Sequence, residues 1–246
     1  GAIRGYLEQR RVLKFLDGIR VSGERASHIV ENMLSFSRRS EASKAPVLLD
    51  RLLDKSVELA AHDYDLRKKF DFRDIRIVRH YEAALPEVPC VATEIEQVIL
   101  NLLRNAAQAM TETMGTRPPE IVLTTRRHLD QAIVSIADNG PGIPDVLRSR
   151  VFEPFFTTKD VGIGTGLGLS VSYFIITSHH GGQLSVESEV GQGTCFTISL
   201  PFEAAGDPPV DSAATPAGRA STDRRISGLS KTATACRAAS GGGETS

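Results

Sequence analysis

The sequence has little of what marks several large protein classes. Its three cysteines are odd in number and far apart in 246 residues, so they predict neither a disulfide framework nor a zinc site. They indicate a reducing, cytoplasmic compartment. No apolar run of about 18 residues could span a bilayer, so we expect no direct membrane insertion. The net charge is -1 and no basic run stands out, so nucleic acid is not an expected partner.

What remains is an ordinary globular composition. The chain is 41% apolar and 24% charged, and it is long enough to bury one sizeable core. Three regions follow one another along it: an amphipathic segment at 1–43, an alternation of helical and strand patterns at 45–202, and a segment at 203–246 that is mostly Ala, Gly, Ser, Thr and Pro. The last of these has too few large apolar residues to offset the entropy of ordering, which predicts a disordered tail or a linker.

Residues 1–43 show a heptad pattern. Apolar residues recur every seven positions at Val12, Ile19, Ala26 and Met33. This period predicts one long amphipathic helix of a left-handed supercoil, whose apolar stripe needs a partner helix. The alternative is an ordinary amphipathic helix that lies on the neighbouring domain.

Residues 45–202 predict an α+β fold, a mixed sheet covered by helices on one face. We expect helices at 50–61, at 93–113 and from about Leu167, the second of them begun by a capping box of Thr93 and Glu96. We expect strands at 75–81, 120–126, 131–138, 183–187 and 194–200. His179 and His180 precede two glycines and are interpreted as caps at the end of the third helix.

A polar row runs along the second of these helices. Gln97, Asn101 and Asn105 are spaced four residues apart, so they share one helix face. Carboxamide oxygens in such a row can ligate a hard cation such as Mg²⁺, which keeps waters and phosphate oxygens as its other ligands. A solvated stripe with no ligand is the alternative.

An acidic residue ends the apolar strand at 131–138 and a Gly/Pro-rich segment follows it. Burial would leave the Asp138 carboxylate in need of a donor, and an exocyclic amino group such as adenine N6 can supply one. Gly140 and Gly142 let a flat ring approach the backbone. A plain turn is the alternative.

A third block runs from Phe152 to Ser170. Glycines at every second position from Gly162 to Gly168 predict a loop whose N–H groups face phosphate, with the positive end of the next helix behind it. Lys159 can meet a polyphosphate as a point charge. A flexible lid with no ligand is the alternative.

Taken in order, these blocks resemble the sensor histidine kinases of bacterial two-component systems, a GHKL family with the Bergerat ATP-binding fold. There they are the N, G1, F and G2 boxes. The resemblance covers 45–202 and implies that Asn105 binds Mg²⁺ and that Asp138 accepts from adenine N6. It implies roles in ATP binding for Asn101, Asn105, Asp138, Gly140, Gly142, Ile143, Lys159, Gly164, Thr165, Gly166, Leu167, Gly168 and Thr194.

The N-terminal segment resembles the second helix of that family's dimerisation and phosphotransfer hairpin. The first helix, with the phosphoacceptor histidine, has no counterpart here, because no histidine precedes His28 and an isoleucine follows it. The resemblance implies a homodimer in the parent protein and a response regulator receiver domain as partner. It leaves the membrane attachment of the parent open.

The sequence therefore predicts the ATP-binding catalytic domain of a protein-histidine kinase. It would transfer the γ-phosphoryl group of ATP to a histidine outside this chain, for relay to a response regulator. One alternative is a nucleotide-binding and dimerisation module without transfer activity. The other is a GHKL ATPase, which the resemblance disfavours because Asn101 stands where those enzymes have a glutamate base.

Overall fold

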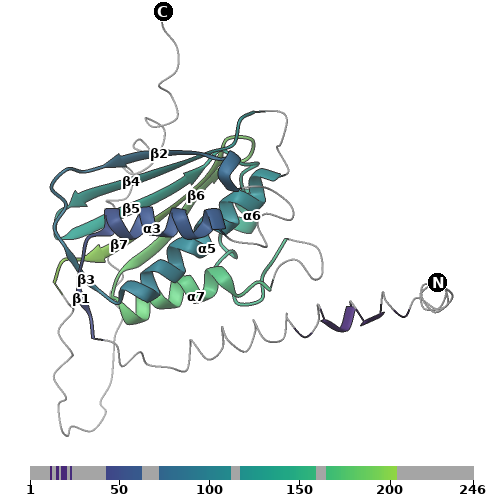
Figure 1. The fold of residues 1–246 in the computed structure, drawn as a ribbon, viewed down its shortest axis with the longest axis horizontal. Helices are drawn as coiled ribbons and strands as arrows, with labels where there is room; N and C mark the ends of the chain where they lie inside the picture. The colour runs from purple at the N-terminus through teal and green to yellow at the C-terminus, as the bar shows by residue number, and fades with distance from the viewer. Residues whose placement is uncertain are drawn as a thin grey trace, which may run out of the picture.

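The computed structural model describes residues 43–62, 72–111, 117–158 and 165–203, with a few isolated positions between 12 and 23. Across this part of the chain, a five-stranded sheet is covered on one face by α3, α5 and α7 (Figure 1). The helical elements of the described residues are α3 (Leu49–His62), η1 (Phe72–Asp74), α5 (Ala92–Met110), α6 (Asp145–Arg148), α7 (Gly168–Phe174) and the π-helical η3 (Ile175–His179). The strands are β1 (Ala45–Val47), β2 (Arg76–Tyr81), β3 (Val88–Cys90), β4 (Glu120–His128), β5 (Gln131–Asp138), β6 (Gln183–Glu189) and β7 (Gly193–Pro201). The expected α+β fold, a mixed sheet with helices on one face, is confirmed.

The large sheet has the strand order β2-β4-β5-β7-β6. Strands β2 and β4 are parallel, and the other neighbours are antiparallel. The register of β5 on β7 places Asp138 opposite Thr194, so the end of one central strand meets the beginning of the other. This pairing brings together two residues that are 56 positions apart in the sequence, as their numbers show.

Helix α5 is the centre of the apolar core. Its buried side chains pack under the sheet, and the larger fully buried ones on α5, β4 and β5 are Ile95, Ile99, Leu102, Leu103, Met110, Ile121, Leu123 and Ile136. Burial of each such side chain contributes about 1.5–3 kcal/mol relative to exposure. The helix is thereby fixed in rotation, so its polar row has a defined direction.

Several details differ from the expectation. The two-stranded sheet of β1 and β3 was not foreseen, because three-residue strands show no alternation. Pro46 lies within β1 and pairs with Pro89. The expected capping box is wrong. Helix α5 begins at Ala92, its N-cap is Val91 without a side-chain cap, and Glu96 instead forms an ion pair with Lys55 at 2.6 Å.

Two expected segments lie almost wholly outside the described residues. These are the N-terminal amphipathic helix at 1–43, of which only isolated positions such as Leu16 and Ile19 are described, with exposed side chains, and the tail from 204 onward. Among the described residues, no helix is both long and apolar enough to cross a membrane.

Candidate functional site

Asp138 ends β5 at the rim of the sheet. Its Oδ1 accepts a hydrogen bond from the Gly140 N–H at 2.9 Å, and the backbone N–H of Thr194 also donates to the carboxylate. Burial nevertheless raises the pKa of Asp138 from 3.8 to about 6, against the lowering effect of these two donors and of Arg117. The two donors and Arg117 therefore offset only part of the cost of desolvating the carboxylate.

The loop after Asp138 is held close to its neighbours. A Cβ on Gly140 would lie 2.8 Å from Asp138 Oδ1, and a Cβ on Gly142 would lie 2.2 Å from the Glu189 carbonyl oxygen. Gly142 also has a φ of +77°, which L side chains rarely adopt. Gly142 is therefore required by its φ and by the approach of the backbone, whereas a Cβ on Gly140 would displace the Asp138 carboxylate.

Asn139 has a structural part in the same loop. Its Oδ1 accepts from the Glu120 N–H at 3.0 Å, and its Nδ2 donates to the Pro118 carbonyl at 2.8 Å. Nearby, Arg117 Nη2 donates to the Gly140 carbonyl at 2.6 Å. These contacts fix the loop to the start of β4.

Ser188 on β6 is the site residue that the sequence reasoning missed. Its Oγ accepts from the Ile143 N–H at 2.7 Å, donates to the Gly193 carbonyl at 2.8 Å and lies 2.9 Å from Thr194 Oγ1. A single serine therefore joins two predicted site residues from different segments. A lone serine in a strand has no motif around it, and only the strand register could have pointed to it.

The polar row of α5 meets the beginning of α7. Asn101 Nδ2 donates to Ser172 Oγ at 3.0 Å, and a Cβ on Gly168 would lie 2.4 Å from Asn101 Oδ1. Asn105 lies one turn further along α5 and is half-buried, whereas Gln97, one turn before, is exposed. The structure thus brings Asn101 together with the glycine segment, as the sequence order suggested.

The aromatic block precedes that glycine segment and is tied to it. The Phe155 N–H donates to the Gly166 carbonyl at 2.8 Å, with Phe155 at a φ of +66°. Phe152 packs against the core at Phe196, with ring centroids 6.4 Å apart, and against the ring of the exposed Tyr173, 5.3 Å away. Phe155 itself is 59% exposed, whereas Phe152 is half-buried.

The predicted phosphate loop is described only at its C-terminal end. Thr165, Gly166, Leu167 and Gly168 are placed there, and the Leu167 N–H donates to Thr165 Oγ1 at 3.4 Å. Lys159 and Gly164 lie outside the described residues, so their predicted roles stay predictions. Among the described residues, no group of three or more His, Cys, Asp or Glu side chains could hold a metal ion.

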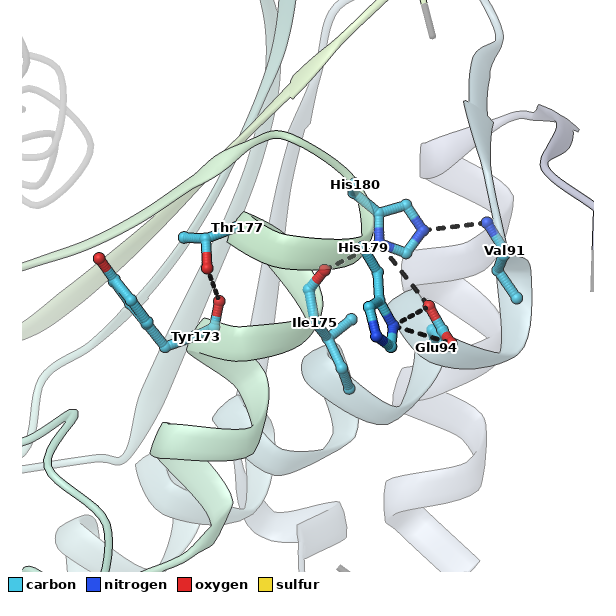
Figure 2. A network of polar contacts seen from close by, with 7 residues as sticks. All are labelled: Val91, Glu94, Tyr173, Ile175, Thr177, His179 and His180. Carbon is cyan, nitrogen blue, oxygen red and sulfur yellow. Dashed lines mark hydrogen bonds and ion pairs between the residues drawn. The ribbon is translucent and has the colours of Figure 1, made fainter. Parts of the chain in front are cut away.

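The histidine pair replaces the expected capping box (Figure 2). His180 is buried, its Nδ1 donates to the Ile175 carbonyl at 3.0 Å, and its Nε2 accepts from the Val91 N–H at 3.1 Å. These two bonds require the neutral Nδ1–H tautomer. His180 therefore caps the end of η3, as expected. It also accepts from the backbone N–H of Val91, the N-cap of α5, which was not expected.

His179 and Glu94 complete this contact between the two helices. His179 Nδ1 lies 3.2 Å from both carboxylate oxygens of Glu94, in the first turn of α5. Burial lowers the pKa of His180, in keeping with its neutral state. The cluster thus joins the start of the helix with the asparagine row to the end of the helix that follows the glycine segment. His62, the one histidine with an acidic residue after it, ends α3, where its Nδ1 lies 2.8 Å from the Glu58 carbonyl oxygen.

Comparisons with known proteins indicate the family of this domain. Residues 90–204 match the model of the histidine kinase-, DNA gyrase B-, and HSP90-like ATPase family. The sensor kinase CckA of Brucella abortus is 37% identical over 193 residues, which cover 74% of this chain and 20% of CckA. This chain spans from about a fifth to about half of the curated relatives that head the comparison.

Solved structures give the same result. The catalytic domain of the histidine kinase ThkA is 30% identical with a TM-score of 0.54, over 65% of this chain and 99% of that one. ThkA in complex with the response regulator TrrA is 26% identical with a TM-score of 0.61, over 79% of this chain and 52% of that one. Full-length ShkA in complex with AMPPNP is 28% identical with a TM-score of 0.62, over 78% of this chain and 39% of that one.

Proposed function

This chain belongs to the sensor histidine kinases, through an ATP-binding domain of the histidine kinase-like ATPase family, and we propose that it binds Mg·ATP and donates the γ-phosphoryl group to a histidine on another segment or chain. The observation that supports the proposal best is the half-buried Asp138 at the rim of the sheet, with two backbone N–H donors and a raised pKa. Such a carboxylate is suited to accept from the amino group of adenine.

The polar row of α5 fits Mg²⁺ by its chemistry. Carboxamide oxygens are hard ligands, and Mg²⁺ takes few protein ligands when phosphate and water oxygens complete its shell. Asn105 would hold the ion, and Asn101, whose amide is oriented by Ser172, would support the phosphates next to Gly168. The ion would neutralise charge on the phosphates.

The residues of this chain would act by positioning. Asp138 and Thr194 would orient the base, and the backbone of Gly164 to Gly168, with Lys159, would hold the phosphates in line with an incoming imidazole. Neither Asn101 nor Asn105 can take a proton from water. This chemistry supports transfer over the hydrolysis that a glutamate base would promote in a GHKL ATPase.

The wider setting is part of the same proposal. Residues 1–43 would be one helix of the dimerisation hairpin, 45–202 the catalytic domain and 203–246 a tail or linker. The large sheet supports a catalytic domain that begins before the family match, because β2 at 76–81 is one of its strands. The ThkA–TrrA complex supports a response regulator as the next acceptor. A homodimer in the parent protein and a cytoplasmic location complete the proposal.

A transfer assay tests the proposal. The full chain is mixed with γ-³²P-labelled Mg·ATP and a separate hairpin polypeptide that contains a phosphoacceptor histidine, and acid-labile label on the hairpin is measured. We expect transfer by the wild-type chain, and none by Asn105→Ala while its circular dichroism spectrum stays unchanged. Gln97→Ala, an exposed amide on the same helix row, is the matched control and should transfer normally.

Two results would count against the proposal. ATP binding without transfer to any hairpin would favour the module that binds nucleotide and transfers nothing. Micromolar Mg·ATP affinity in a folded Asn105→Ala variant would overturn the role of that asparagine.

A further inference from the structure

The contacts of Ser188 determine whether the Thr194 hydroxyl donates or accepts in the hydrogen bond between the two. Ser188 has one hydroxyl hydrogen, and the Gly193 carbonyl at 2.8 Å can only accept it. The Ile143 N–H at 2.7 Å can only donate into Ser188 Oγ. The remaining contact, 2.9 Å from Ser188 Oγ to Thr194 Oγ1, therefore uses the hydrogen of the threonine.

The Thr194 hydroxyl is consequently left with lone pairs alone. It is buried, with 7% of the residue exposed, so water offers it little alternative. Asp138, its cross-strand partner, is also an acceptor when ionised. Opposite residues of an antiparallel pair have Cβ atoms about 4.5–5.5 Å apart, so the two acceptors lie side by side.

We propose that Ser188 is a specificity-determining residue: it holds the Thr194 hydroxyl as an acceptor, so that the site takes a purine with an exocyclic amino group and rejects one with a carbonyl at the same position. The inference rests on the proposed function, because it assumes that the base lies at Asp138 and Thr194. An amino group brings two hydrogens to two acceptors. A carbonyl brings no hydrogen, so its oxygen would face the oxygens of Asp138 and Thr194 without a hydrogen bond.

Ser188 acts here through Thr194 and is a positioning residue. Without its hydroxyl, the Thr194 hydroxyl is free to rotate and to donate to a carbonyl. The Ile143 N–H loses its acceptor at the same time, which weakens every nucleotide to a similar degree. The ratio of two affinities therefore separates the effect on selectivity from the effect on pocket shape.

The test is calorimetric titration of the full chain with Mg·ATP and with Mg·ITP, whose hypoxanthine has a carbonyl in place of the amino group. We expect Ser188→Ala to lower the preference for ATP over ITP by about tenfold, the equivalent of one buried hydrogen bond. Ser185→Ala removes the same hydroxyl elsewhere on β6 and should leave the preference unchanged. Ser188→Thr keeps a hydroxyl at this position and should also retain the preference for ATP over ITP.

If Ser188→Ala leaves the ratio of ATP affinity to ITP affinity unchanged, whether or not both affinities fall, the inference is overturned and the proposed function stays intact. If Ser188→Ala does not fold, Thr194→Val removes the acceptor hydroxyl itself and should also lower the preference for ATP over ITP. An unchanged ratio in Thr194→Val would overturn the inference too. Failure of the wild-type chain to bind ATP at all would instead overturn the proposed function, and the inference with it.

Discussion

Replacement of Asp138 by asparagine should make the nucleotide-free domain more stable and strongly lower its affinity for ATP. The rise in pKa from 3.8 to about 6 means that the folded state disfavours the ionised carboxylate. Each pKa unit corresponds to about 1.36 kcal/mol, so ionisation costs the fold about 3 kcal/mol at pH 8. Asparagine is neutral at every pH and of the same size. It gives up the charge-assisted bonds from the backbone, so we expect a net gain of about 2 kcal/mol.

The sign of the pH dependence follows from the direction of the shift. A folded-state pKa above the unfolded one means that the folded state binds more protons between about pH 4 and 6, so stability falls as the pH rises through that window. The advantage of Asp138→Asn should be full at pH 8 and should vanish as the pH falls towards 4. Other titrating groups, His180 included, are common to both proteins and cancel in the difference.

Urea unfolding followed by far-ultraviolet circular dichroism suits this chain, which has no tryptophan for fluorescence. The free energies of unfolding of both proteins are compared from pH 4 to 8, and their affinities for ATP are measured at pH 8. We expect a loss of affinity of about a hundredfold or more. The Gly140 N–H would hold the amide oxygen of the asparagine, so that the amide N–H₂ would face the adenine amino group as donor against donor. A stability difference that does not vary with pH, or unchanged ATP affinity, would refute the reasoning.

Two further predictions concern the contacts around α7. Gly168→Ala should change the free energy of unfolding by less than about 1 kcal/mol, because the gain in helix propensity offsets the lost Asn101–Ser172 bond. The added Cβ should displace Asn101 and so lower the affinity for ATP at least about tenfold. Wild-type affinity of this variant by calorimetry would contradict the prediction. His180→Ala should cost about 2–4 kcal/mol in urea unfolding through a cavity and an unpaired Val91 N–H. Since the pKa of His180 is lowered, its stabilising effect is present above pH 6.5 and is lost as the pH falls below that value, so the penalty should shrink in acid; a penalty equal at pH 8 and pH 5 would refute this.

Much of the fold could be predicted from the sequence where one period dominates. The strand at β5 was expected at its observed bounds, and α3 within one residue at each end, because apolar alternation and amphipathic spacing are strong there. The start of α5 was misread, since Thr93 and Glu96 fit a local capping pattern. The structure instead uses His180, 89 residues away from Val91, which no local pattern could reveal.

The site shows the same division. Asp138, Gly140 and Gly142 could be found because one short segment contains the carboxylate and the glycines that its geometry requires. Ser188 could not, because its role arises only when β6, β7 and the loop after β5 meet in space. Sequence patterns therefore gave the groups that would touch a ligand, and the structure added one that positions them.

The most direct test of the account is calorimetric titration of the full chain with a non-hydrolysable ATP analogue, with and without Mg²⁺. The account predicts saturable binding at one site per chain, at least about tenfold tighter with Mg²⁺ than without it. Absence of binding in both conditions, by a chain whose circular dichroism and urea transition show it to be folded, would contradict the account.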